Sequence, residues 1–450
     1  MMLSSESTKI LLETIKRLIR RGAMSNLRKI INKTHAADLA LIFRLLTPRE
    51  QKLIFDLMER TEQKAELFRE VEHEHLVNVI EDMPPEKIVE ILHVMPRDDV
   101  ADILEKFDKE QTRYILELMR EEDSAKVKGL LRYDTKTAGG IMSPDFIALT
   151  ENATAKEAIA SLQRENIEMA FYLYVVDDDM HLVGVISLRQ LVLVPPETKL
   201  KEIMSTDIVS VQTSMDQEDV AKIVARYNLL AVPVVDENNK LVGIVTVDDV
   251  IDIIREEATE DILKMAGAGE EFVAGPYSVL KSIRKRIPWL FASWIGGIIA
   301  SYVIKHFQHD LNKLVYLAAF MPIIMGMGGN VGNQSSTIVV RGLATGRLNV
   351  KQFWQIISTE LSTGFVLGFI YGTLLGMFAN FQYEIWALGL VVGLGMVCSM
   401  TLAAAVGSFL PLIFMRFHVD PAVATGPFVS TATDVLSMVL YFNIAKMLIF

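Results

Sequence analysis

The final third of the chain contains five long stretches of predominantly apolar residues. They cover residues 287–304, 314–340, 354–378, 385–414 and 421–448. A helix needs about 20 apolar residues to cross the hydrocarbon core of a bilayer, which is about 30 Å thick. The pattern therefore predicts a transmembrane domain of five helices, which we place at residues 281–450.

The middle of the chain contains two segments that resemble each other. Leu182–Ser187 (LVGVIS) in the first has its counterpart in Leu241–Thr246 (LVGIVT) in the second. Short Val- and Ile-rich runs alternate with helical patterns, which is typical of a small α/β unit. We expect tandem α/β repeats at residues 133–199 and 200–252.

Residues 1–132 are rich in helix-forming residues, and prolines at positions 48, 84, 85 and 96 interrupt the helical pattern. Short amphipathic helices must bury their apolar faces against one another, so the pattern predicts an all-α superhelical array of undetermined hand. Between the second repeat and the first predicted span, the acid-rich run Val247 to Glu271 predicts one amphipathic helix. We assign residues 253–280 to this connecting helix.

Charge is distributed unevenly along the chain. The net charge is −11 overall, with +6 in residues 281–450 and −17 in the first 280 residues. This acidic balance argues against nucleic-acid binding and is consistent either with metal cations as partners or with solubility alone. Basic residues precede the first predicted span and follow the second and the fourth, and the positive-inside bias therefore places the N-terminus in the cytoplasm and the C-terminus outside.

Enzymatic chemistry has little support in the sequence. Cys398 is the only cysteine and lies in an apolar run, which excludes an intrachain disulfide and disfavours thiolate chemistry. The chain has neither a P-loop nor zinc-ligand spacing. We therefore expect no enzyme, and the N-terminus shows no cleavable signal peptide.

Three motifs resemble those of the MgtE family of magnesium channels. The first is Gly-Gly-Asn-x-Gly-Asn-Gln-Ser at residues 328–335. The second is Asp420-Pro421-Ala422 leading to Thr433-Asp434, and the third is residues 138–144, AGGIMSP, which open the first of two cystathionine-β-synthase (CBS) motifs. The resemblance covers the N-terminal array, the CBS pair and the five spans. It implies a homodimeric magnesium channel in a bacterial-type plasma membrane.

The predicted pore residues combine one acid with polar and small residues inside spans. Asp434 is the only ionisable residue between Asp420 and Lys446, and a carboxylate in a bilayer is costly unless it faces water or a partner. The resemblance implies that this acid from each subunit holds hydrated Mg²⁺, which prefers oxygen ligands. The remaining predicted pore residues are Gly328, Asn330, Asn333 and Glu360. Helix packing is the alternative for these small and polar residues.

Acids outside the spans are the predicted magnesium sensor. Asp98 and Asp102 lie one helical turn apart on one face, where like charges repel unless a cation bridges them. The resemblance implies that regulatory Mg²⁺ binds between such acids and closes the pore. The predicted set is Asp98, Asp102, Glu218, Asp249, Asp252, Glu257, Glu260 and Asp261.

Two positions depart from the family pattern. Paired CBS motifs often bind adenine nucleotides, and the resemblance implies that an ATP site would include Tyr172, Arg189 and Thr246. Gln190 replaces an aspartate in the first motif, which weakens the prediction of ATP binding. Gly426 stands where relatives often have asparagine, so ion selectivity or rate could differ.

Two other functions fit the same sequence. A cation-coupled secondary transporter would need an additional ion site, and a membrane-anchored CBS sensor would use the spans only as anchors. The polar run at residues 326–336 and Asp434 favour transport over anchoring.

Overall fold

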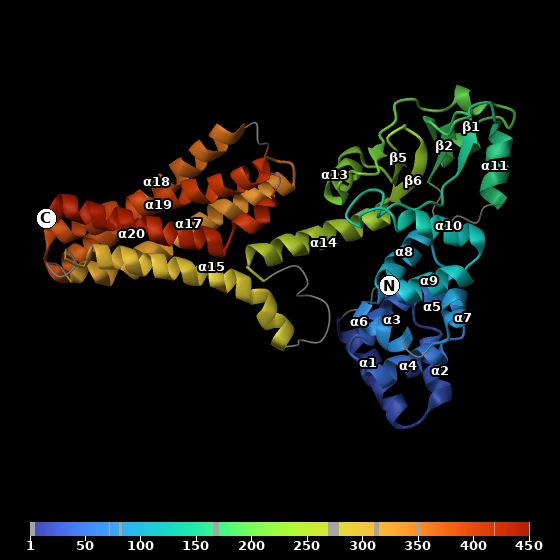
Figure 1. The fold of residues 1–450 in the computed structure, drawn as a ribbon, viewed down its shortest axis with the longest axis horizontal. Coiled ribbons are helices and arrows are strands. Elements are labelled where there is room, and N and C mark those ends of the chain that lie inside the picture. The colour runs from blue at the N-terminus through green and yellow to red at the C-terminus, as the bar shows by residue number, and fades with distance from the viewer. Residues whose placement is uncertain are drawn as a thin grey trace. The chain divides into compact units, whose positions relative to one another are not determined.

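The computed structural model describes residues 5–71, 73–80, 83–164, 171–268, 279–309, 315–348, 352–417 and 419–449. The chain divides into two compact units, Met1–Arg255 and Glu256–Phe450. The first unit contains the α-helical array and two small sheets, and the second contains long helices (Figure 1).

Short helices make up the N-terminal part of the first unit. They are α1 Ser5–Arg20, α2 Met24–Ile31, α3 Ala36–Phe43, α4 Pro48–Leu57, α5 Thr61–Glu70, α6 His73–Ile80, α7 Pro85–Leu92, α8 Arg97–Glu105, α9 Lys109–Leu118 and α10 Glu121–Leu130. The predicted proline breaks coincide with helix starts at α4, α7 and α8. Proline is tolerated in the first turn because the N–H it lacks would have no intrahelical partner there. Alternate helices pack together, as α3 does with α5 and α5 with α7.

The two repeats form matching sheets of three strands each. The first contains β1 Ala148–Thr150, β2 Tyr172–Val176 and β3 Leu182–Ser187, with helices α11 Ala155–Arg164 and α12 Leu188–Leu193 and the 3₁₀ turn η1 Leu200–Glu202. The second contains β4 Val211–Gln212, β5 Ala231–Val235 and β6 Leu241–Thr246, with helix α13 Gln217–Tyr227. In each sheet the first two strands are parallel and the last two antiparallel. The predicted repeat is therefore confirmed in its topology.

One apolar core joins the helical array to the second repeat. It includes Leu104 of α8, Val245 of β6 and Val250 of helix α14 (Val247–Met265), all of which are buried. Ser143 is held against β6 by two backbone hydrogen bonds with Ile244, of 2.7 and 2.9 Å. This packing brings the start of α8 close to the end of β6.

Helix α14, Val247–Met265, is shorter than the sequence pattern predicted. The helix was expected to continue to Glu271, but it ends at Met265 because Gly267 adopts a left-handed conformation with φ of 66°. Glycine favours this conformation because it has no Cβ. Residues 269–271 of the predicted helix lie outside the described residues.

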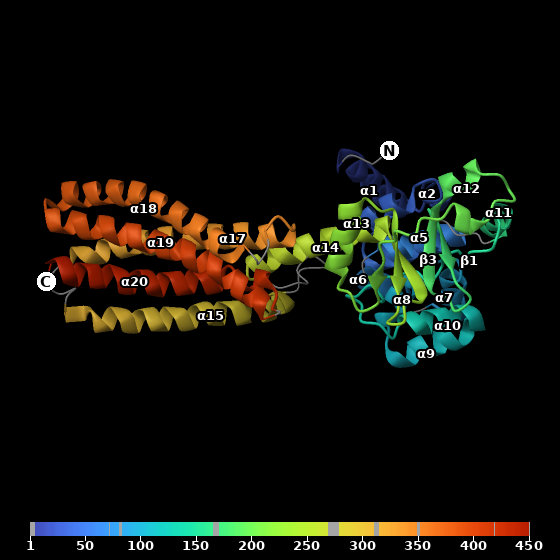
Figure 2. The ribbon, with the colours of Figure 1, turned by 90° about the horizontal axis from the view of Figure 1, so that it is seen from above.

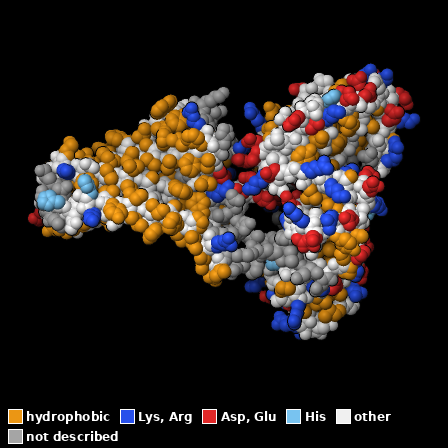
Figure 3. Space-filling model, viewed as in Figure 1, with side chains coloured by type: hydrophobic (Ala, Val, Ile, Leu, Met, Phe, Trp, Pro, Cys, Tyr) orange, Lys and Arg blue, Asp and Glu red, His pale blue; other side chains and the backbone are white. Residues whose placement is uncertain are grey.

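The second unit is a bundle of long helices that run side by side in both views (Figures 1 and 2). They are α15 Val279–His306, α17 Tyr316–Ala344, α18 Phe353–Tyr383, α19 Trp386–Arg416 and α20 Pro427–Ile449, with the 3₁₀ turn η3 Pro421–Ala424 before α20. Helix α19 packs against α17, α18 and α20. The surface of this unit is apolar over most of the face in Figure 3, as expected for helices in contact with lipid.

Among the described residues, four of these helices are long and apolar enough to span a membrane: α15, α18, α19 and α20. Helix α17 is long enough, but Asn330, Asn333 and Gln334 interrupt its apolar sequence. It nevertheless packs inside the bundle against α19 and α20. The five predicted spans thus correspond to the five long helices, with the last one divided into η3 and α20.

Candidate ion sites

Five aspartates, which we call the acidic cluster, gather where the helical array meets the second repeat. They are Asp98, Asp99 and Asp102 of α8 and Asp248 and Asp249 of α14. Asp98 and Asp99 of α8 and both aspartates of α14 lie in the first turns of their helices, where the helix dipole favours negative charge. The cluster joins residues far apart in the sequence, because the common core fixes α8 beside β6.

Few groups balance the charge of the acidic cluster. Arg69 of α5 pairs with Asp99, with Nε 2.7 Å from Oδ2. Ser143 donates a hydrogen bond of 3.2 Å to Asp98, and Thr246 donates one of 2.6 Å to Asp249. Within the described part of the chain, Oδ1 of Asp248 is buried without a hydrogen-bond partner.

The cluster carboxyls hold their protons more tightly than free aspartates do. Burial, followed by repulsion from Asp99, raises the pKa of Asp98 to about 6. Burial also raises the pKa of Asp99 and of Asp249 to about 7, although Arg69 acts in the opposite direction on both. Burial also raises the pKa of Asp102. Its side chain is more exposed than those of Asp98 and Asp99, so solvent screens its charge more effectively. A cation between these carboxylates would relieve the same repulsion.

The other predicted sensor residues have different surroundings. Glu218 pairs with Lys222 of its own helix at 3.1 Å, and Asp252 with Arg255 at 3.6 Å. Both pairs are partly or largely exposed, so they contribute little to stability. Glu257, Glu260 and Asp261 lie in the part of α14 that belongs to the second unit.

In the second unit, the Asp434 carboxylate lies in the contact between α17 and α20. A Cβ placed on Gly329 of α17 would lie 3.7 Å from Oδ1 of Asp434, so this glycine leaves space beside the carboxylate. Asp434 is partly buried. It has no hydrogen-bond or ion-pair partner among the residues that the structure describes. An unpaired carboxylate within an apolar bundle is costly unless it meets water or a cation.

The predicted polar pore residues divide into two groups. Asn333 donates a hydrogen bond of 2.9 Å to Ser430 of α20, and its Oδ1 is buried without a described partner. Asn330, three residues earlier on α17, is exposed in the single chain. Both α17 amides thus retain an oxygen that could act as a ligand, on the helix that contacts Asp434.

Gly328 and Glu360 contact other parts of the bundle. A Cβ on Gly328 would lie 2.6 Å from Oγ of Ser399 and 3.0 Å from Oγ of Ser437, so this glycine permits close packing of α17 on α19 and α20. Glu360 of α18 accepts a hydrogen bond of 2.7 Å from Ser335. Neither residue has a described contact with Asp434.

No group of three or more His, Cys, Asp or Glu side chains in the described parts of the chain is arranged to hold a metal ion. A closed Mg²⁺ site would need octahedral oxygen coordination. One carboxylate and neighbouring amide oxygens supply only part of such a shell, so water or a second copy of the chain must complete it.

The predicted nucleotide residues lie on different repeats. Tyr172 is on β2, and Arg189 is exposed at the start of α12. Thr246 is buried, and its hydroxyl donates a hydrogen bond to Asp249. Gln190 caps α12 through Ser187, whose hydroxyl donates a hydrogen bond of 2.9 Å to the Gln190 amide oxygen. Gln190 therefore serves as a helix cap, as Asp249 does after Thr246.

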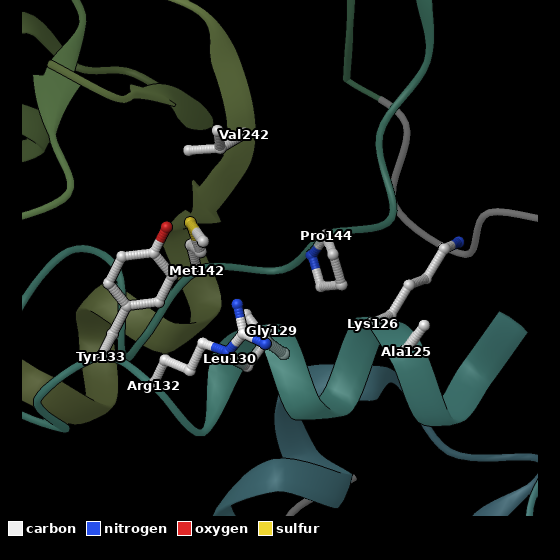
Figure 4. Close-up of a pocket in the computed structure, with 9 residues that line it drawn as sticks. All are labelled: Ala125, Lys126, Gly129, Leu130, Arg132, Tyr133, Met142, Pro144 and Val242. Carbon is white, nitrogen blue, oxygen red and sulfur yellow. The ribbon is translucent and has the colours of Figure 1, made fainter. Parts of the chain in front are cut away.

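A cavity of about 420 Å³ lies between α10 and β6 (Figure 4). Arg132 and Tyr133 direct their polar ends toward it, whereas Met142, Pro144 and Val242 form an apolar side. None of the three predicted nucleotide residues lines it.

Together, the apolar helical bundle, its unpaired carboxylate and the acidic first unit are the features of a membrane cation transporter with a large domain outside the bundle. Comparison of the sequence with known protein families identifies the kind of transporter. Residues 321–444 match the MgtE divalent cation transporter family, residues 34–136 the MgtE intracellular N domain, and residues 138–197 and 200–256 the CBS domain.

Relatives cover most of the chain. The chain is 39% identical to the magnesium transporter MgtE of Enterococcus faecalis over 72% of this chain and 71% of that protein. It is 37% identical to the corresponding transporter of Thermus thermophilus over 72% of this chain and 73% of that protein. The chain belongs to the MgtE family.

Solved structures resemble the first unit. The cytosolic domain of the Mg²⁺ channel MgtE in complex with ATP matches 54% of this chain with a TM-score of 0.51, at 34% identity and over 99% of that domain. The soluble part of a magnesium transporter matches 56% of this chain with a TM-score of 0.50, at 32% identity and over 99% of that chain. Both confirm the helical array and CBS pair.

Several residues at these sites were not identified from the sequence. Asp248 adjoins the predicted Asp249, so its acidity was a usable signal. No sequence pattern indicated that Arg69 would pair with Asp99 or that Ser430 would contact Asn333, because each pair comes from separate elements.

Proposed function

We propose that the protein is a homodimeric magnesium channel that conducts Mg²⁺ into the cytoplasm and closes when intracellular Mg²⁺ binds its acidic domains. The observation that carries this proposal is the unpaired Asp434 carboxylate beside Gly329. Two such carboxylates across a two-fold axis would provide a site for a hydrated ion. The orientation that we propose places the N-terminus in the cytoplasm and the C-terminus outside.

The acidic cluster supports the regulatory half of this proposal. Asp98, Asp102 and Asp249 repel one another across the contact between α8 and α14. A divalent cation would relieve this repulsion and stabilise the compact arrangement. It can shift the population only by the difference in its affinity for the two arrangements. Asp99 and Asp248 would act with these three residues.

Electrical recording from the full-length protein in lipid bilayers tests the proposal. A channel should give ohmic single-channel magnesium currents that magnesium on the cytoplasmic side suppresses. Asp434→Ala should lose these currents, whereas the matched variant Glu384→Gln should keep them because Glu384 follows α18 outside the bundle. Unaltered currents in Asp434→Ala would refute the pore assignment.

The same recordings separate the two alternatives. A coupled secondary transporter would give flux that requires a second cation gradient and no single-channel steps. A membrane-anchored sensor would give no flux but would still bind Mg²⁺. The sparse ionisable groups of the bundle, with Glu360 hydrogen-bonded to Ser335, favour the channel over coupling.

ATP is a second ligand that we propose for the first CBS repeat. The supporting observation is Arg189, which is exposed and has no described partner. Tyr172 of β2 pairs with Ser187, the last residue of β3 before the helix that carries Arg189. Calorimetric titration of the full-length protein with ATP should show binding that Arg189→Gln weakens. Arg132→Gln, at the separate cavity beside α10, is the matched control and should bind ATP normally.

A further inference from the structure

Lys264, near the end of α14, lies between two carboxylates in the second unit. Its ammonium contacts Glu260 one turn earlier on α14 and lies 2.6 Å from Oδ2 of Asp420, just before η3. The side chains of Lys264 and Glu260 are only 12% and 16% exposed, whereas that of Asp420 is 35% exposed. Solvent therefore screens the pair of Lys264 with Glu260 much less than a surface pair, and the pair of Lys264 with Asp420 to an intermediate degree.

Asp420 has two roles in this arrangement. Its Oδ1 accepts a hydrogen bond of 2.8 Å from the Ala422 backbone and so caps η3, while its Oδ2 accepts from Lys264. The ammonium therefore connects α14 to the turn that leads directly into α20. This connection joins residues 156 positions apart in the sequence.

The backbone packing at the same place is equally close. Gly426 has a φ of 56°, and a Cβ there would lie 2.4 Å from the Met265 carbonyl oxygen. A Cβ on Gly267 would lie 3.1 Å from Pro427 at the start of α20. An asparagine at position 426, where the family pattern often has one, would therefore need α14 to shift.

We propose that Lys264 is a positioning residue that acts as an internal cation, holding the last turn of α14 at the start of α20 without any divalent ion. Glu260 and Asp420 are two negative charges that share one ammonium. Removing the ammonium takes away the positive charge between Glu260, which is 16% exposed, and Asp420, which is 35% exposed, and removing one partner of a largely buried ion pair is destabilising. An effect of α14 on the pore depends on the proposed function, whereas the contact between Lys264 and Asp420 is observed in the structure.

Pulsed electron paramagnetic resonance on the full-length protein tests this proposal. Spin labels would be attached to Ile262→Cys on α14 and Phe417→Cys after α19, in a Cys398→Ala background. Both label sites are exposed, at 62% and 73%, and both lie in the second unit. The distance between labels would be measured in EDTA, without Mg²⁺.

In dimers of labelled chain diluted with unlabelled chain, the parent protein should give one narrow distance between the two labels of a chain in EDTA. Lys264→Met keeps approximately the length of the side chain without its charge and should broaden the distribution of this distance. The ratio of molecules in which the end of α14 is held at η3 to molecules in which it has separated should fall by at least about tenfold. Lys264→Arg should restore the narrow distance. Asp420→Asn, which still provides an acceptor to cap η3, should broaden it because it removes one carboxylate from the pair.

Two results would overturn the proposal. One is an unchanged narrow distance in Lys264→Met, and the other is a distance that is already broad in the parent protein in EDTA. A variant that fails to fold would be recognised by its elution in size-exclusion chromatography, and Lys264→Arg with Asp420→Asn would then decide the matter. Magnesium currents are recorded separately, so loss of the channel proposal would leave this distance result standing.

Discussion

The acidic cluster and Asp434 are both carboxylate sites, but their surroundings differ. In the first unit, five aspartates share Arg69 and two hydroxyl donors. In the bundle, Asp434 has no described partner and lies beside a glycine. Crowded carboxylates repel one another, and bound cations or protons would relieve that repulsion, whereas a solitary carboxylate keeps its oxygens available to an ion. This difference is the basis of the separate roles in sensing and in conduction that we propose.

The largest expected effect follows from removing the charge of the acidic cluster. The triple variant Asp98→Asn, Asp102→Asn and Asp249→Asn removes the carboxylates that would bind Mg²⁺ together with their mutual repulsion. Closure should therefore lose most of its dependence on magnesium, and the change in open probability between low and high cytoplasmic magnesium should shrink by at least about tenfold, as measured by single-channel recording. Conduction itself should persist because Asp434 is intact. Asp252→Asn, an exposed acid paired with Arg255, is the control, and normal closure in the triple variant would refute the sensor role.

A smaller effect is expected from Arg69→Gln, which removes the cation that pairs with Asp99. The contact between the helical array and the second repeat should lose about 1–2 kcal/mol in metal-free buffer, since hydrogen bonds to charged groups contribute on this scale. Added Mg²⁺ should recover most of this loss. Differential scanning calorimetry with and without Mg²⁺ measures both values. Arg226→Gln, on the exposed side of α13, should change neither.

Proton binding should weaken the same repulsion. The pKa of Asp98 is raised from 3.8 to about 6, and those of Asp99 and Asp249 to about 7. The folded form therefore binds more protons than the unfolded form over this range, and the stabilisation is complete below about pH 3.8 and lost as pH rises through 6 to 7.

Hydrogen exchange of residues 97–105, corrected for the intrinsic rate, measures this dependence in metal-free buffer. Protection should be greater at pH 5.5 than at pH 8, and Mg²⁺ at pH 8 should restore it. Equal protection at the two pH values would show that the acidic cluster is not strained by its own charge.

The smallest expected effect concerns the corresponding caps of the two repeats. Gln190→Asp would make the first repeat like the second, in which Asp249 caps α14 through Thr246. Both residues cap a helix, so the unfolding free energy should change by less than about 0.5 kcal/mol. ATP affinity, measured by calorimetry, should increase if the aspartate supplies the missing ribose contact. A large loss of stability would show that the two caps are not equivalent.

Much of the fold could be predicted from local patterns. The strands of both repeats and the starts of α4, α7 and α8 follow from alternation and proline positions, because these signals act within a few residues. The long helices of the bundle follow from apolar length. The end of α14 was predicted too late, since the alanine and glycine residues at 266–269 still fit a weak helical pattern and only the backbone conformation of Gly267 reveals the stop.

The candidate sites were predictable only in part. Asp434 was identified because an isolated acid in an apolar run is conspicuous, and Asp98 and Asp102 because they are one turn apart. Glu218 and Asp252 matched the family pattern but pair with basic residues of their own helices. Their predicted role in sensing is not tested by these contacts.

The sequence by itself determined the division of the chain into an acidic region and an apolar helical region, the duplicated repeat and the presence of a lone carboxylate among apolar residues. Those properties depend on composition and on spacing along the chain. Only the tertiary structure decided that Arg69 forms an ion pair with Asp99 and that Lys264 forms one with Asp420. It also decided that the Met265 carbonyl oxygen lies where a side chain at position 426 would begin, so that only glycine fits there. Each of these contacts joins residues from separate elements, and no local pattern encodes which surfaces will meet when the elements pack.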